Sequence, residues 1–180
     1  MRAGTKVFAH LGYANATVDD VIREAGTSRR TFYEHFDDLR DLLLQLHERS
    51  GTRAFRAVEQ YVLAQEHPHD QLRAGVEGFL GLIANFGDEA RVLFREVSAL
   101  GPEHQVRRDA LLQRFATLMS QGVARSHAMG IAKRPPDELR IFALVAAIEA
   151  IGMRYVERRD EGRALEAVEP LVDLIRRAFE

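Results

Sequence analysis

The chain has 180 residues, of which 46% are hydrophobic and 29% charged, a composition typical of a globular protein with one mid-sized or two small domains. Its lack of cysteine excludes disulfides, thiolate zinc sites, iron–sulfur clusters and cysteine nucleophiles, and fits a reducing compartment. A net charge of −2 excludes a polycation that binds nucleic acid by bulk charge, so any such binding needs a local surface.

The sequence pattern is helical almost throughout. Apolar residues recur every three to four positions, and no sustained alternation of apolar and polar residues indicates a strand. We therefore predict an all-α fold of about nine helices. The longest apolar run begins at Ile141, is interrupted by Glu149 and is far shorter than the roughly 20 residues that span a bilayer. No secretory signal is recognised, and we expect a cytoplasmic protein with no membrane partner.

Three short helices are predicted at the start of the chain. The first ends at Gly12, a residue suited to helix termination. The second begins at Thr17-Val18-Asp19-Asp20, which has the hydroxyl and the acids of a capping box, and it stops at Gly26. Ser28 caps the third, which runs from Arg29 to Phe36. Two short helices joined by a tight glycine-containing turn have the anatomy of a helix-turn-helix.

A long helix is predicted from Asp38 to Gln65. Its middle, from His47 to Arg53, is polar and contains Gly51, which costs about 1 kcal/mol relative to alanine in a helix. We interpret this helix as a connector between two bodies, with a solvated middle and a flex point at Gly51, followed by a loop over residues 66–70. Pro170 is expected in the first turn of the final helix. Apolar stripes place the remaining helices at about residues 70–86, 92–100, 103–130, 137–158 and 170–179.

The helix over residues 137–158 is apolar on nearly every side between Leu139 and Val156. A helix without a polar face must be buried all round, and a domain this small offers little to cover its outer side. We expect the same helix of a second copy to cover it, with the last helix completing a four-helix dimer bundle. The alternative is a helix at the centre of its own domain.

The third short helix carries the residue types that a recognition helix needs. Its outward donors are suited to base edges and phosphate oxygens, and the hydroxyls near its start lie where the backbone also favours phosphate. Phe32 and Phe36 would anchor it from behind. Taken alone, two adjacent arginines are often only solvated surface, so the ordered combination of residues carries the interpretation. The donors are Ser28, Arg29, Arg30, Thr31, Tyr33 and His35.

This combination closely resembles the DNA-binding domain of the TetR (tetracycline-repressor-like) family of bacterial transcriptional regulators. The resemblance covers about residues 3–45 and is specific, because several spaced elements agree at once. The remaining residues resemble the family in their helical pattern and in the last two helices, which form the dimer in the family. The matching segments are Phe8-Ala9-His10-Leu11-Gly12-Tyr13, Thr17-Val18-Asp19-Asp20-Val21, Ala25-Gly26-Thr27-Ser28, Thr31-Phe32-Tyr33-Glu34-His35-Phe36 and Asp41-Leu42-Leu43.

The resemblance implies a DNA-binding domain over residues 1–45 and a helical ligand-binding and dimerisation domain over residues 46–180. It implies a dimeric repressor that binds a near-palindromic double-stranded operator and is released by a small molecule. The homodimer would form through the helices at about residues 137–158 and 170–179. The DNA-contacting residues that the resemblance implies are Thr17, Thr27, Ser28, Arg29, Arg30, Thr31, Tyr33, His35 and Arg40.

Two departures from the family pattern are visible. The family usually has a lysine that touches DNA backbone where this chain has Leu39, so either Arg40 substitutes for that lysine or one phosphate contact is lost. The family's first helix also begins well upstream of the position of Phe8, often with a basic arm. We favour truncation of the start over a missing arm, because a two-turn first helix would cover the domain poorly.

A mostly apolar effector is expected between the helices that start near residues 38, 70, 103 and 137. Glu149 is a carboxylate inside an apolar run, so it should face a ligand, pair with Arg154 or the second subunit, or reach solvent. Glu96 has similar options, pairing with Arg91 or Arg95, and each aromatic residue is equally suited to ordinary core. The candidate pocket residues are Phe79, Phe86, Phe94, Glu96, Phe115, Met119, Phe142, Glu149 and Met153.

Other chemistry finds little support in the sequence. His67 and His69 flank Pro68, but no helical histidine pair with metal-ligand spacing occurs, so we expect no metal and no cofactor. No phosphate-binding glycine loop or nucleophile elbow is present, and we predict no enzymatic activity. The alternative to a DNA-binding regulator is a helical dimerisation or adaptor protein that kept the fold without operator binding, which the Leu39 departure slightly favours.

Overall fold

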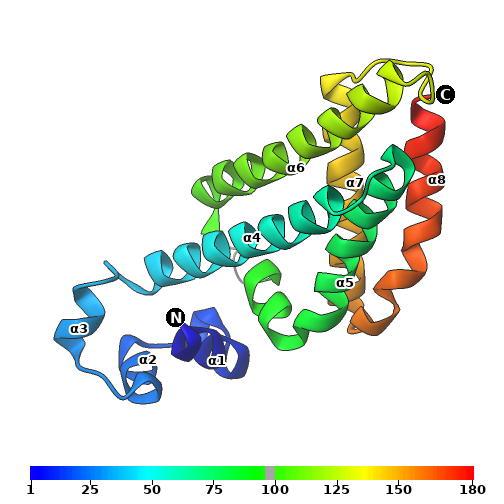
Figure 1. Cartoon of the computed structure of the whole chain (residues 1–180). Coiled ribbons are helices and arrows are strands. Elements are labelled where there is room, and N and C mark those ends of the chain that lie inside the picture. Colours follow the sequence, from blue (N-terminus) through cyan, green and yellow to red (C-terminus); the bar gives the residue numbers. More distant parts are fainter. Residues whose placement is uncertain (96–99) are drawn as a thin grey trace. The chain divides into compact units, whose positions relative to one another are not determined.

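The computed structural model describes residues 1–95 and 100–180, and within them the side chains of all residues except 86–95 and Glu103. Within these ranges the chain forms eight α-helices and short 3-10 segments, with no strand, which confirms the predicted all-α fold class. The residues group into two compact units (Figure 1). Unit 1 comprises Met1–Gly51 and Phe86–Arg107, and unit 2 comprises Thr52–Asn85 and Arg108–Glu180.

Unit 1 opens with three short helices whose ends follow the sequence signals. Helix α1 (Arg2–Leu11) ends at Gly12, whose φ of 74° is easily adopted only by glycine. Helix α2 (Val18–Ala25) begins with the predicted capping box and ends at Gly26 in the left-handed conformation. Helix α3 (Arg29–Tyr33) is shorter than predicted, because the backbone after Tyr33 tightens and the amides of His35 and Phe36 both donate to the carbonyl of Phe32.

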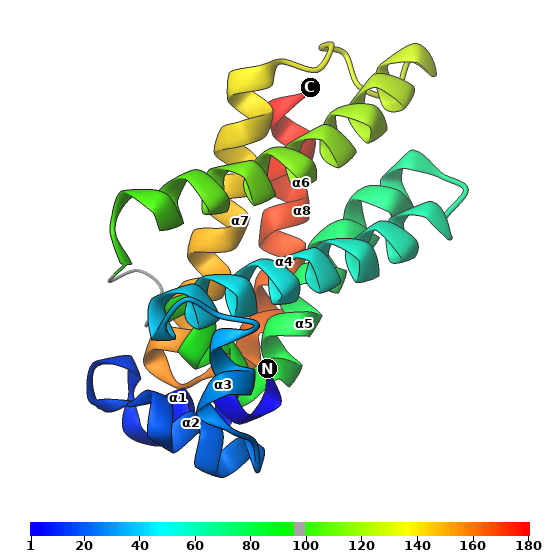
Figure 2. The same ribbon diagram turned by 90° about the vertical axis from the view of Figure 1, so that its left-hand side faces the viewer.

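The core of unit 1 holds the short helices against the first half of α4 (Leu39–Leu63), and Figure 2 shows them from a second side. Phe32 of α3 is only 3% exposed and contacts Phe36 at 5.4 Å between ring centroids, as predicted for the anchors of this helix. Burial of such apolar side chains is the main stabilising contribution to a domain of this kind. The buried cluster consists of Val7, Phe8, Val21, Phe32, Leu42, Leu43, Leu44, Leu46 and Leu100.

The predicted solvated middle of α4 is wrong at His47. The side chain of His47 is buried, and its ring lies edge-on to that of buried His104, with 4.8 Å between centroids. His104, which is distant in sequence, therefore covers His47, although the neighbouring sequence of His47 is polar and predicts exposure. The helix itself is continuous through Gly51.

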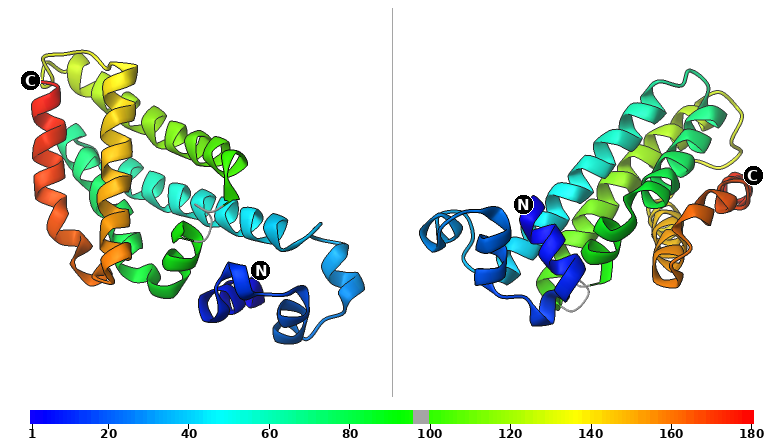
Figure 3. Two further views of the ribbon diagram at one scale, coloured as in Figure 1. Left: turned by 180° about the vertical axis from the view of Figure 1, so that it is seen from behind. Right: turned by 90° about the horizontal axis from the view of Figure 1, so that it is seen from below.

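Unit 2 contains the second half of α4 and most of the remaining helical residues. They belong to α5 (Pro68–Arg95), α6 (Pro102–Ala128), α7 (Glu138–Arg158), a 3-10 segment (Glu161–Ala167) and α8 (Val168–Ala178). Helices α7 and α8 lie side by side, as Figures 1 and 3 show from opposite sides. Pro170 lies in the first turn of α8, as predicted.

Two predicted boundaries around α5 are wrong. The expected separate helices at about 70–86 and 92–100 are one continuous helix from Pro68 to Arg95, which reduces the predicted nine helices to eight α-helices in the described residues. The intervening Gly87-Asp88-Glu89-Ala90 contains no proline, so nothing forces a break. The predicted loop over 66–70 is also shorter, because Pro68 is the first helical residue, a position at which its missing N–H is not needed.

Helix α7 has a buried side and an uncovered apolar side in the single chain. Ile141, Leu144 and Ile148 are buried, whereas Leu139 is 77% exposed and Ala143 and Ala150 are also exposed. Spacings of four and seven residues place the three exposed residues on one stripe of the helix. The expectation that this helix is covered all round is therefore not met by its own chain.

Candidate nucleic-acid interface and ligand cavity

The short helix α3 presents its polar side chains outward from unit 1. Ser28 caps it by accepting a hydrogen bond from the amide of Thr31 at 3.1 Å, and Phe32 fixes it to the core. Arg30 is 90% exposed and Tyr33 53% exposed. A five-residue helix held by a cap and one aromatic anchor thus leaves its donors free to approach a molecule outside unit 1.

Both predicted arginines have acidic partners within unit 1. The guanidinium of Arg29 donates to Asp19 on α2, with Nη2 at 2.6 Å from each carboxylate oxygen. These hydrogen bonds raise the pKa of Arg29. Arg30 donates from Nε to Glu34 at 3.0 Å across one turn. Exposed pairs of this kind are weak and exchange readily for a stronger anionic partner, such as phosphate.

Several of the predicted hydroxyl contacts serve as helix caps. The hydroxyl of Thr17 donates to Asp20 Oδ2 at 2.6 Å and the backbone amide of Thr17 donates to the same oxygen at 3.0 Å, and these two bonds lower the pKa of Asp20. The Thr17 hydroxyl also accepts from the Asp20 amide at 3.2 Å, which caps α2. The Ser28 and Thr31 hydroxyls lie 3.0 Å apart and share a hydrogen bond. Thr17 and Ser28 therefore hold the starts of α2 and α3, which positions the exposed face.

The remaining predicted interface residues are spread over neighbouring turns. Thr27 and His35 are exposed at the two ends of α3. Arg40 is exposed, and its Nη2 lies 3.4 Å from the carbonyl oxygen of Leu100. Leu39, at the position where the resemblance expects lysine, is half-buried and packs against the core of unit 1. Leucine at this position thus contributes to packing.

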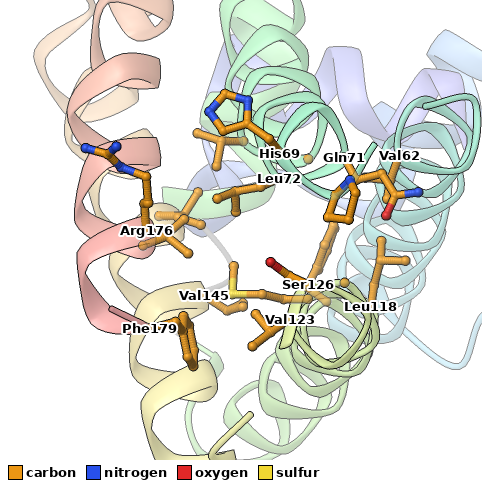
Figure 4. Close-up of a pocket in the computed structure, with 18 of the residues that line it drawn as sticks. Val62, His69, Gln71, Leu72, Leu118, Val123, Ser126, Val145, Arg176 and Phe179 are labelled. Carbon is orange, nitrogen blue, oxygen red and sulfur yellow. The ribbon is translucent and has the colours of Figure 1, made fainter. Parts of the chain in front are cut away.

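Unit 2 encloses an apolar cavity of about 370 Å³, within the range of small-molecule sites (Figure 4). Helices α4 to α8 all contribute side chains to its wall, as the sticks around the central space show. Sequence reasoning had no signal for most of these residues, because valines and leucines of a ligand cavity look like ordinary core. The lining includes Val58, Val62, Leu72, Val76, Leu112, Leu118, Val123, Val145, Ile148 and Phe179.

The predicted pocket residues fall into three groups. The cavity lining includes Phe79, Phe115, Met119 and Glu149, and the rings of Phe79 and Phe115 meet edge-on at 5.8 Å. Two others, Phe142 and Met153, are half-buried on α7 and do not line the cavity. The side chains of Phe86 and Phe94, and Glu96 as a whole, lie outside the described residues.

Glu149 is the buried charge of the cavity wall. It is 8% exposed, and its partner is Arg108 of α6, whose Nε donates to Oε1 at 3.0 Å while Nη2 donates to Oε2. The predicted partner Arg154 is wrong, because that side chain is exposed on α7. Burial raises the pKa of Glu149, and the hydrogen bonds from Arg108 oppose the rise. Proximity of α6 to α7 could not be read from sequence.

Metal binding and membrane insertion find no support in the described residues. No group of three or more histidine, aspartate or glutamate side chains in that part of the chain is placed to hold a metal ion. None of its helices has a stretch long and apolar enough to cross a membrane.

Two family models match the chain. The one described as "Bacterial regulatory proteins, tetR family" matches residues 1–46, and the one described as "Tetracyclin repressor-like, C-terminal domain" matches residues 65–158. Among related proteins, the HTH-type transcriptional activator FasR of Mycolicibacterium smegmatis is 28% identical over 56% of this chain. The match spans only 46% of the length of FasR. An HTH-type transcriptional regulator of Haemophilus influenzae is 22% identical over 87% of this chain and 77% of its own length.

Solved structures of similar fold cover nearly the whole chain. The transcriptional regulator FadR of Bacillus subtilis, in complex with stearoyl-CoA, superposes with a TM-score of 0.85 at 17% identity, over 99% of this chain and 97% of its own. The fatty acid degradation regulator FadR of Bacillus halodurans gives 0.82 at 17% identity, over 97% and 91%. The capped helix-turn-helix, the helical unit that follows it and the two matching family models lead to one conclusion: this chain belongs to the TetR family of bacterial transcriptional regulators.

Proposed function

We propose that residues 1–45 bind a near-palindromic operator and that α3 is the recognition helix. The observation that carries this proposal is the exposed row of donors on a helix that a serine caps and a buried phenylalanine anchors. Arg30 and Tyr33, both exposed, would reach base edges or phosphates. Arg29 would contact DNA while it stays paired with Asp19. Further contacts would come from Thr27, Thr31, His35 and Arg40. Thr17 and Ser28 would orient the surface through their caps.

We propose that two copies pair through α7 and α8 in residues 46–180. The exposed stripe of Leu139, Ala143 and Ala150, together with Leu174 of α8 at 48% exposed, offers an apolar surface of small side chains. Two such faces can pack about a two-fold axis and bury each other's apolar area. A dimer fixes the separation of two recognition helices, which an operator with two half-sites requires.

We propose that the cavity of unit 2 binds a long, mostly apolar effector that releases the protein from DNA in the cytoplasm. The lining is apolar over most of its length, and the structurally similar FadR of Bacillus subtilis was solved with stearoyl-CoA. An effector that prefers one conformation of the dimer weakens operator binding by its differential affinity. Helix α4 would transmit the change, since it is continuous from Gly51, the last residue of the first segment of unit 1, to Thr52, the first residue of unit 2.

The test of operator binding is selection of bound sequences from a random duplex library at about 0.15 M salt, where non-specific binding is weak. We expect a palindrome, with affinity reduced at least about 100-fold in the Arg30→Ala/Tyr33→Ala variant. Arg56→Ala, which removes an exposed arginine from α4 in unit 2, is the matched control and should bind normally. No enriched sequence would reject the proposal and favour the adaptor alternative.

A further inference from the structure

The cavity of unit 2 has two chemically different ends. Its wall follows α6 from Leu112 to Ser126, a path of about 21 Å at the rise of an α-helix. The polar part of the lining includes the side chains of His69, Gln71 and Ser126 and the charged side chains of Arg176 and Glu180, which lie 3.8 Å apart. Near Leu112 the lining is aromatic and aliphatic, with Glu149 as the charged residue among those described. A ligand with a polar head and a long apolar chain would therefore place its head among these side chains and its chain toward Glu149.

The carboxylate of Glu149, a residue of the cavity wall, keeps hydrogen-bonding capacity beyond its pair with Arg108. Arg108 supplies one hydrogen bond to each carboxylate oxygen. Each oxygen of an ionised carboxylate accepts about two hydrogen bonds, so both retain an acceptor site. Arg108 lies one turn before Leu112 on α6 and does not line the cavity. The group that a ligand meets at this end is thus an acceptor held in place from behind.

A charged pair in this wall is poorly explained by stability. Replacement of a buried ion pair by apolar residues of similar size is often neutral or stabilising, because desolvation of the charges is costly. Most of the residues that line the cavity are apolar, so a pair of leucines at positions 108 and 149 would be compatible with its wall. The pair is better explained by a contact that an apolar wall cannot make.

The charges at this end select among ligand groups. A second carboxylate or a phosphate would be repelled by Glu149, and an ammonium group would lose its hydration and be repelled by the guanidinium of Arg108. A hydroxyl has one proton to donate and no charge to desolvate, which suits an acceptor that is already paired. We propose that Glu149 is a specificity-determining residue that selects an apolar chain carrying a hydroxyl at its inner end. This inference rests on the proposed long-chain effector of the cavity.

The test compares palmitic acid with 16-hydroxypalmitic acid, which differ by one hydroxyl at the far end of the chain. Direct calorimetric titration into the full-length protein at pH 7.5, with each probe as monomer, measures binding without DNA. We expect the hydroxylated probe to bind about tenfold more tightly, as a hydrogen bond to a charged acceptor allows. The Arg108→Leu/Glu149→Leu variant should lose or reverse this preference. Glu149→Gln, which keeps one acceptor oxygen, should retain a preference of a few-fold.

The matched control is Arg163→Leu/Glu166→Leu, which removes an exposed ion pair of the same unit away from the cavity and should keep the tenfold preference. Equal binding of the two probes by the parent protein would overturn the role of Glu149 while leaving the long-chain effector intact. An unchanged preference of the Arg108→Leu/Glu149→Leu variant for 16-hydroxypalmitic acid would also overturn the role of Glu149. Binding of neither probe would instead reject the long-chain effector, and this inference with it.

Discussion

Arg29, the first residue of α3, donates to both carboxylate oxygens of Asp19 in the first turn of α2, at 2.6 Å to each. The pair ties the start of one short helix to the start of the other. Both side chains are more than half exposed, so the pair adds little to the stability of unit 1. Its effect is on orientation, because it limits how far α3 can rotate relative to α2.

Asp19→Ala should therefore reduce selectivity more than affinity. Removal of the acid frees Arg29 and takes one negative charge from a surface that would face phosphate, so binding to unrelated duplex should strengthen a few-fold. The ratio of operator affinity to non-specific affinity should fall about tenfold, because the guanidinium of Arg29 is no longer held in one orientation by Asp19. Titration of both duplexes by fluorescence anisotropy checks this. Glu24→Ala, which removes an acid paired with Lys6, is the control, and an equal fall in the ratio there would contradict the orientation argument.

Gly122→Leu should block the cavity without unfolding the protein. Gly122 lines the cavity, and a Cβ at this position meets no atom within 4 Å. The added side chain can enter the open space, so binding of palmitic acid should weaken at least about 100-fold through overlap with the ligand. Operator affinity and melting temperature should stay near those of the parent. Loss of operator binding together with a lower melting temperature would show that the cavity position is needed for the fold.

Two glycine-to-alanine changes in unit 2 should act in opposite directions. A Cβ at Gly152 of α7 would overlap Ile83 Cδ1 and lie 3.3 Å from a ring atom of Phe79, so Gly152→Ala should cost about 2 kcal/mol of unfolding free energy. A Cβ at Gly81 of α5 meets its nearest neighbour at 3.9 Å, so Gly81→Ala should add about 1 kcal/mol. Urea denaturation measures both. Equal effects would mean that α5 and α7 pack less closely than described.

The pH dependence of stability should report the buried carboxylate. Burial raises the pKa of Glu149 in the folded protein above the ordinary 4.5, so the folded state takes up a proton before the unfolded state does as pH falls. The unfolding free energy of the parent should accordingly rise relative to that of Glu149→Gln as pH falls through the folded pKa, and this relative change should level off near 4.5. Denaturation at pH 7.5 and at pH values down to about 4.5 tests the sign. A difference that is constant with pH would contradict the raised pKa.

Ala150→Arg should dissociate the proposed dimer. Ala150 lies on the exposed apolar stripe of α7, and a charged side chain in an apolar two-fold contact faces its own copy and loses water. We expect the dissociation constant to rise at least about 100-fold in analytical ultracentrifugation. Ala110→Arg makes the same change at an exposed position of α6 and should leave the dimer intact. Equal dissociation of both variants would place the interface elsewhere.

The sequence was most informative where a single residue determines a local conformation. The capping box at Thr17, the glycine ends at Gly12 and Gly26 and the first-turn proline at Pro170 were all predicted, because each depends on neighbours within four positions. The continuity of α5 was missed because a pause in apolar residues looked like an end. Contacts across unit 2 were missed for a different reason. The pairing of Arg108 with Glu149 depends on how α6 and α7 meet, over 41 positions of sequence.

The hydroxyls of Thr17 and Ser28 accept hydrogen bonds from the backbone of their own helices. This limits the number of base pairs that one subunit can specify. In the proposed complex, hydroxyls that already cap α2 and α3 would leave the reading of bases to a short run of side chains that includes Arg30 and Tyr33. A half-site contacted by so few side chains has few specified base pairs, and such a short sequence recurs often by chance in a genome. The free-energy penalties for mismatched base pairs add, so a dimer that binds two half-sites multiplies the selectivity of each. The rarity of a target would then come from the spacing and pairing of the half-sites, and a lone subunit would be a poor discriminator.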